Sequence, residues 1–229
     1  MLNKKVLTVL MSIAIPFALG ACHSADVGEP PVTVDVPTTT TAYDILLDQP
    51  ELTLAPSATW VEMTTRVDRG DHDLVDTTRL PVDRGNLFLS ADAYGDVQID
   101  GLAIAFDDVV AGQGTVTADG FRLTDIVARL DSPVACDAVK WRRDGNLCST
   151  TATLQLTLDW SLKIGNEIYP LGAQQLGNMD LYIEIYLQRD QLHAELEGVA
   201  TGVFWNWADI VEFSDLSLYT MARTGPIVD

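Results

Sequence analysis

An alternation of apolar and polar residues runs through most of the chain after residue 42, and this period of two restricts the fold to β structure. Between residues 151 and 164, every second residue from Leu154 to Ile164 is apolar and those between are polar. Residues 179–187 repeat the pattern, and after a short turn near residues 188–191 it resumes at Leu192. Successive side chains of a strand point to opposite faces, so each stretch is predicted to be a half-buried strand. The second and third stretches together predict a long antiparallel hairpin.

Further strands are predicted over residues 97–106, 121–130 and 215–221, with shorter ones over 60–67 and 87–91. Residues 123–130 and 206–214 also fit a short helix. We therefore predict one all-β domain over residues 43–229, with about nine to twelve antiparallel strands. Long amphipathic strands suit a single antiparallel β-sandwich or a barrel-like domain. The apolar face then forms either a filled core or a cavity, and the sequence leaves both open.

The N-terminus has the pattern of an export signal. Two lysines, Lys4 and Lys5, precede an apolar stretch that ends in Leu19-Gly20-Ala21-Cys22. This ending resembles the lipobox of bacterial lipoproteins. The resemblance implies that residues 1–21 are a signal peptide and that Cys22 becomes an acylated, palmitate-bearing N-terminus. His23 at the next position, rather than Asp, implies the outer membrane, facing the periplasm or the cell surface.

The alternative to lipidation is ordinary cleavage near Ala21, which would leave Cys22 as a plain thiol. Residues 22–42 hold three prolines and a run of threonines, and no core-forming pattern. This composition predicts a disordered, semi-extended tether between the acylated N-terminus and the β domain.

Three cysteines are present, an odd number. If Cys22 carries lipid, Cys136 and Cys148 remain as a pair, and an oxidising compartment favours a disulfide between them. The alternative is two reduced, buried thiols.

The formal net charge of −19 makes the chain strongly acidic. Nucleic-acid binding needs clustered cations, so we expect no nucleic-acid partner. No apolar run reaches the roughly 20 residues of a membrane-spanning helix. The membrane is therefore expected to be a partner only through the lipid anchor.

Two groups of residues are candidates for a ligand surface. Lys140, Trp141, Arg142 and Arg143 form a positive spot that could hold an anionic ligand. Trp205 and Trp207 share a face if their segment is extended, and they could stack on sugar rings or pack into the core. Pairing with neighbouring acids is the alternative for the cations.

Four carboxylates lie close together in the sequence, at Asp68, Asp71, Asp73 and Asp76. Clustered carboxylates suit Ca²⁺, but the spacing lacks the order of a known calcium loop, so this is a weak candidate beside a solvated acidic loop. No other metal site and no cofactor is indicated.

The sequence lacks recognisable catalytic motifs, including a nucleophile elbow, a phosphate-binding loop and a metalloprotease motif. We therefore expect a non-enzymatic binding or structural accessory role at the cell envelope, with an envelope protein as partner. One alternative is a carrier of an apolar ligand such as a lipid, in a cavity lined by Leu154, Leu158, Leu181 and Ile185. The other is an enzyme acting on envelope polysaccharide.

Overall fold

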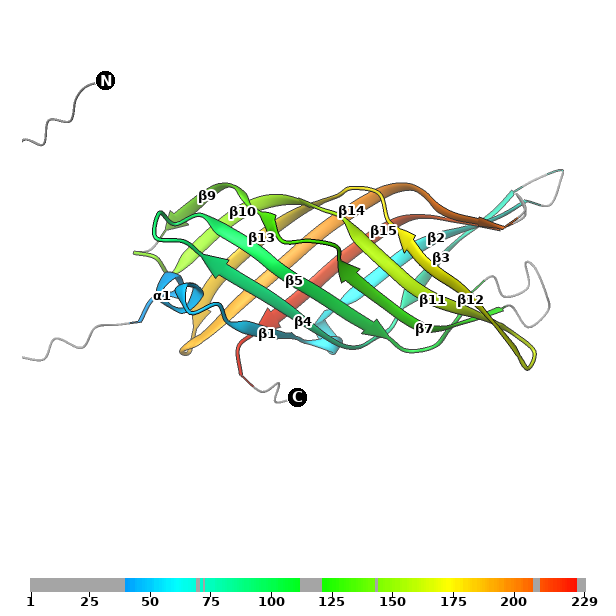
Figure 1. Ribbon diagram of the computed structural model, residues 1–229, viewed down its shortest axis with the longest axis horizontal. Helices are drawn as coiled ribbons and strands as arrows, with labels where there is room; N and C mark the ends of the chain where they lie inside the picture. The colour runs from blue at the N-terminus through cyan, green and yellow to red at the C-terminus, as the bar shows by residue number, and fades with distance from the viewer. Residues whose placement is uncertain are drawn as a thin grey trace, which may run out of the picture. The chain divides into compact units, whose positions relative to one another are not determined.

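A single antiparallel sheet curls around an apolar interior in the computed structural model of the protein (Figure 1). The structure describes residues 40–68, 71, 73–111, 121–142, 144–207 and 211–225, which all belong to one unit of the chain. In chain order the elements are α1 (Ala42–Leu47), β1 (Glu51–Leu54), a 3-10 turn η1 (Pro56–Ala58), β2 (Trp60–Asp68), β3 (Asp73–Leu80), β4 (Val82–Ala91), β5 (Val97–Phe106), β6 (Val109–Ala111), β7 (Phe121–Leu130), β8 (Val134–Ala135), β9 (Asp137–Arg142), β10 (Leu147–Leu154), β11 (Leu156–Ile164), β12 (Glu167–Gln175), β13 (Met179–Gln188), β14 (Gln191–Trp207) and β15 (Val211–Arg223).

The main path of the sheet runs β12-β11-β7-β5-β4-β1-β15-β14-β13-β10-β9. Strand β15 is a branch point, because part of it pairs with β1 and part with β2, which in turn pairs with β3. Among the described strands the sheet is not closed by hydrogen bonds, and β9 and β12 at the two ends of the path each pair on one side only. The curl nevertheless brings β8 near β10, β3 near β6 and β12 near β14. The result is a barrel-like domain, as predicted.

The inward face of the sheet is apolar and tightly packed. Buried, mostly apolar side chains alternate with more exposed ones on β5, β10, β13, β14 and β15. Leu154, Leu158, Leu181 and Ile185, which were candidates for lining a cavity, are 0–2% exposed and belong to this cluster. Side chains that line an empty ligand cavity would be accessible to water, and these four are not. This part of the interior is therefore a filled core.

Helix α1 lies at one end of the curled sheet (Figure 1). Thr41 caps it by accepting a hydrogen bond from the Asp44 amide, and the Asp44 carboxylate accepts one from the Thr41 amide in return. The helix buries Ala42 and Leu46, and the Tyr43 amide donates to the Gly145 carbonyl at 3.1 Å. The described chain therefore enters the domain at the end that also holds the β9–β10 and β13–β14 turns.

Most predicted strands are confirmed, with three differences. The run at residues 151–164 keeps its alternation but divides at Gln155, because β10 pairs with β9 and β13 whereas β11 pairs with β7 and β12. The helical alternatives are wrong: residues 123–130 belong to β7, and the described parts of 206–214 belong to β14 and β15. Helix α1, which the alternation did not predict, begins one residue before the predicted domain boundary. The spacing Thr41-x-x-Asp44 is the sequence pattern of a helix N-terminal capping box and indicates this helix.

None of the helices in the described residues has the length and apolar character needed to cross a membrane.

A test of the filled core compares two residues of β14 that face opposite sides of the sheet. Leu196 is 0% exposed and Val199 is 48% exposed. Leu196→Ala should lower the free energy of unfolding by about 2–5 kcal/mol, because it removes buried methyl groups and leaves a cavity. Val199→Ala should change it by less than about 0.5 kcal/mol. Urea denaturation of both variants measures this, and equal effects would contradict the assignment of the two faces.

Candidate functional site

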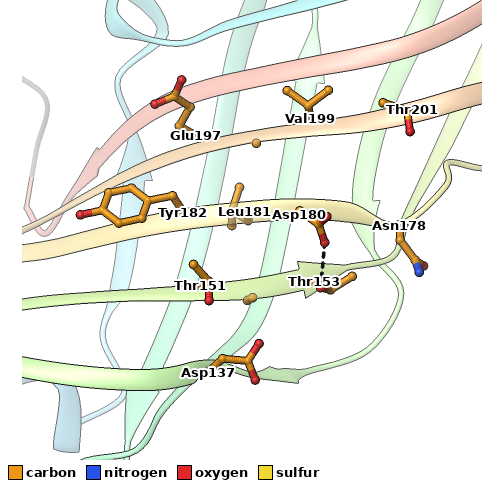
Figure 2. Close-up of a pocket in the computed structure, with 12 residues that line it drawn as sticks. Asp137, Thr151, Thr153, Asn178, Asp180, Leu181, Tyr182, Glu197, Val199 and Thr201 are labelled. Atoms are coloured by element: carbon orange, nitrogen blue, oxygen red, sulfur yellow. Dashed lines mark hydrogen bonds between the residues drawn. The ribbon is translucent and has the colours of Figure 1, made fainter.

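An open hollow lies on the outward face of the sheet, over β10, β13 and β14, with β9 at its border (Figure 2). Its volume is about 740 Å³. The side chains around it are mostly hydroxyls, carboxylates and an amide, together with one aromatic ring; they come from Asp137, Thr151, Thr153, Asn178, Asp180, Tyr182, Glu197, Val199 and Thr201. We call this feature the outer hollow.

The register of the sheet aligns the centre of the outer hollow with aromatic residues of more distant strands. Tyr182 on β13 lies opposite Thr151 of β10 on one side and Glu197 of β14 on the other. Glu197 in turn lies opposite Tyr219 of β15, which lies opposite Trp60 of β2. We call these five residues the Tyr182 row. Its aromatic end is ordered by stacking, with the ring centroids of Trp60 and Tyr219 5.9 Å apart.

Few of the polar groups in the outer hollow are bonded to one another. The Thr153 hydroxyl donates to Asp180 Oδ1 at 3.0 Å, and the Tyr182 hydroxyl donates to Glu184 Oε2 at 3.3 Å. Within the described residues, the carboxylates of Asp137 and Glu197 make no hydrogen bond or ion pair. These acceptors are therefore open to a ligand or to water.

Gly198 is required beneath the outer hollow. It lies between Glu197 and Val199 on β14 and faces inward, opposite Leu181. A Cβ atom at Gly198 would come within 2.7 Å of Leu181 Cδ1 and 3.0 Å of the Asp180 carbonyl oxygen. The glycine thus lets the core close tightly under strands whose other faces carry the hollow.

Beside the outer hollow, four residues farther along β13 and β14 from Tyr182 and Glu197, an aromatic and ionisable group surrounds His193. The His193 ring stacks on Tyr186 with centroids 5.2 Å apart, and the Tyr186 hydroxyl donates to Glu195 Oε1 at 2.7 Å. Burial is the main cause that lowers the pKa of His193, and the nearby positive charge of Arg223 lowers it further, while Glu195 acts in the opposite direction. Burial and the bond to Glu195 raise the pKa of Tyr186. The cluster therefore favours a neutral imidazole and a protonated phenol.

The predicted cationic surface is divided by the strand alternation. Lys140 and Arg142 are exposed, whereas Trp141 between them turns toward the interior, where its Nε1 donates to the Gly95 carbonyl at 2.9 Å. Its ring also meets Tyr43 of α1 edge-on, with centroids 5.3 Å apart. Arg143 lies outside the described residues. The tryptophan and the two described cations therefore do not share one face.

The predicted tryptophan pair is described in part. Trp205 packs against the core, stacked on Phe213 at 5.1 Å between centroids and edge-on to Trp160 at 6.0 Å. The side chain of Trp207 is outside the described part of the structure. Trp205 thus follows the alternative in which the aromatic residue belongs to the core.

The four aspartates of the weak calcium candidate are not gathered into a site. Asp73 pairs with Arg66, and Asp76 accepts a hydrogen bond from the Thr77 amide at 2.9 Å. Asp68 lies opposite Asp73 in the β2–β3 ladder, while Asp76 is on the other face of β3. Among the described residues, no group of three or more His, Cys, Asp or Glu side chains could hold a metal ion.

Cys136 and Cys148 are free thiols in the structure, so the predicted disulfide is absent from it. In the β9–β10 ladder Cys148 lies opposite Trp141, whereas Cys136 precedes β9 and has no partner in that ladder. The Cys136 thiol forms a hydrogen bond with the Thr150 side chain instead of a bond to Cys148, although Cys148 lies nearby. Cys22 lies outside the described residues.

The outer hollow itself was not predicted as a site. The strands that carry it have polar outward faces, which by themselves indicate only contact with water. The sequence feature that could have indicated a binding site is an aromatic residue, Tyr182, in the middle of such a face. The alignment of Tyr182 with Glu197, Tyr219 and Thr151 depends on the pairing of four strands, which the sequence does not reveal.

Comparisons with known proteins add little to this description. No family model matches the chain, and no curated protein matches it. Two solved structures of Ail, the attachment invasion locus protein of Yersinia pestis, align with 76% of this chain. One of them, in complex with the heparin analogue sucrose octasulfate, has 8% identity, a TM-score of 0.38 and 97% of its own chain covered. The other has 9% identity, a TM-score of 0.35 and 99% covered. Scores this low carry no conclusion about function.

The buried thiols lead to a prediction about reactivity. Burial raises the pKa of Cys136 to about 12, helped by the nearby Cys148, and burial raises the pKa of Cys148 to about 11. Only the thiolate reacts, so iodoacetamide at pH 8 should alkylate both residues at least about 100-fold more slowly in the native protein than in urea. Mass spectrometry of the two cysteine peptides measures this. Failure to alkylate them in urea without reductant would show that they are oxidised.

The environment of His193 leads to a prediction about stability and pH. Its pKa in the folded protein lies below the ordinary 6.5 that the unfolded chain retains. As the pH falls below about 6.5, the unfolded state therefore binds a proton that the folded state does not, and stability decreases. The variant His193→Gln should lose less unfolding free energy between pH 7 and pH 5 than the parent protein. Parallel curves for the two proteins in urea denaturation would contradict this.

Proposed function

We propose that this chain is a lipid-anchored protein of the bacterial cell envelope whose β domain has a non-enzymatic binding role. The observation that carries the binding role is the contrast between the two faces of the sheet. The inward face is a filled core, whereas the outward face holds the outer hollow with open hydrogen-bond acceptors. In the described part of the chain, a ligand or partner therefore has access to the outer surface and the ends of the sheet, but not to the interior between its faces.

The anchor is supported by the N-terminal sequence. Leu19-Gly20-Ala21-Cys22 resembles a lipobox, and the described chain begins shortly after, at the end of the domain covered by α1. The outward positions of β10 and β13 carry Ser, Thr, Asp, Glu, Gln and Tyr, with one apolar residue, Leu147. Such a face suits contact with water, so attachment to a membrane would depend on Cys22. We propose that this membrane is the outer membrane.

The filled core disfavours the alternative of an apolar carrier. The four side chains expected to line a cavity have no room for a lipid chain beside them. The described carboxylates of the outer hollow also differ from a typical glycosidase pair. A general acid needs an apolar, shielded environment, and Asp137, Asp180 and Glu197 are all exposed. A binding or structural accessory role is the better fit.

The anchor is tested by labelling with palmitate in a bacterial host. The full chain should incorporate the label and fractionate with membranes, because acyl chains would be attached at Cys22. Cys22→Ser should abolish both the label and the membrane association. Cys136→Ser is the matched control and should retain both. An unlabelled parent protein, or label retained in Cys22→Ser, would refute the anchor.

A further inference from the structure

We infer that the outer hollow binds a neutral glycan whose sugar rings lie along the Tyr182 row, across the strands. This inference rests on the proposed function in that it names the class of ligand for the same outer surface. It is argued from the aromatic rings, the open hydrogen-bond groups and the charge of the described residues.

The aromatic rings provide apolar surfaces at a suitable spacing. Tyr182 is 47% exposed in the outer hollow (Figure 2), and Tyr219 lies two strands away in the same row, beside Trp60. Neighbouring strands are about 4.8 Å apart, so the two tyrosines are separated by about 10 Å across the sheet. This is close to the length of a disaccharide. The C–H faces of sugar rings pack against aromatic rings, so one glycan could contact both tyrosines.

The groups between and around the rings match sugar hydroxyls. Glu197 lies between Tyr182 and Tyr219, and the Thr151 hydroxyl lies on the other side of Tyr182. In the described structure neither side chain has a hydrogen-bond partner, and the same holds for the Asp137 carboxylate. A carboxylate can accept hydrogen bonds from two adjacent hydroxyls of a sugar, and these bonds to a charged acceptor are strong.

The charge of the outer hollow selects among glycans. Among the described residues, three carboxylates line it and no Lys, Arg or His does. Sulfated or uronic-acid glycans would be repelled, whereas neutral glycans are not.

A protein partner fits the outer hollow less well than a glycan. The centres of protein interfaces are depleted in Asp, Glu and Ser, whereas three carboxylates, Asp137, Asp180 and Glu197, line this hollow. Its volume of about 740 Å³ falls in the range of about 300–1,000 Å³ for pockets that hold small ligands. A short stretch of glycan is therefore the occupant that the observations favour.

The test is isothermal titration calorimetry on the full chain in a detergent without a sugar headgroup. The neutral probes are maltohexaose, cellohexaose, laminarihexaose and chitohexaose, and the anionic probe is hexagalacturonate. We expect at least one neutral probe to bind with a dissociation constant at or below about 1 mM, and hexagalacturonate not to bind. Binding of no neutral probe, or preference for hexagalacturonate, would overturn the inference.

Two tyrosines of matched environment identify the site. Tyr182 and Tyr169 are 47% and 45% exposed, and each donates its hydroxyl proton to a glutamate two residues away on the same strand. Tyr182→Ala should weaken binding of the neutral probe by roughly tenfold or more, because it removes a stacking surface. Tyr169→Ala on β12 should leave binding unchanged. Equal effects of the two substitutions would place the ligand elsewhere and overturn the inference.

A second pair of variants tests the hydrogen bonds, and a basic probe tests the competing class of partner. Glu197→Gln should weaken the neutral probe, while Glu167→Gln on β12 should not. Hexalysine could bind more tightly than every neutral probe, with binding that is weakened by Glu197→Gln but not by Tyr182→Ala. This outcome would overturn the inference and reassign the hollow to a basic protein partner. Because palmitate labelling is independent of these titrations, a labelled protein that binds no glycan would refute this inference and leave the proposed anchor intact.

Discussion

Burial of one face of most long strands is the constraint on which the rest of the structure depends. These strands place their apolar side chains toward a common interior, and the curl of the sheet brings these faces together until little space remains. This burial is the dominant favourable contribution to folding. It also decides where function can lie, because a filled interior leaves only the outward face and the ends of the sheet for contact with other molecules.

The pairing of strands from distant parts of the chain builds the outward face. The Tyr182 row draws on β2, β10, β13, β14 and β15, whose residues span most of the domain in sequence. A shift of the register by one residue would turn each of these side chains into the core. The same packing that buries Leu181 against Gly198 therefore holds Tyr182 and Glu197 in the row on the opposite face.

The alternation also separates residues that are neighbours in sequence. Lys140 and Arg142 face outward, while Trp141 supports the end of the domain by contacting Tyr43 and Gly95. A cluster that is compact in the sequence is thus divided by the geometry of a strand, in which adjacent positions face opposite sides. Cys136 and Cys148 are both shielded and remain free thiols, with Cys148 opposite Trp141 in the β9–β10 ladder.

The sequence by itself determined the fold class, most of the strands and the assignment of their faces, because side-chain alternation is a local property of a strand. It also determined the acidic character of the chain and the N-terminal pattern that resembles a lipobox. Only the tertiary structure decided that the interior is filled, that the run at residues 151–164 is shared by two differently paired strands, and that Tyr182 meets Glu197 and Thr151. These features depend on the order and register of strands that are distant in the chain, and local patterns carry no information about which strands will become neighbours.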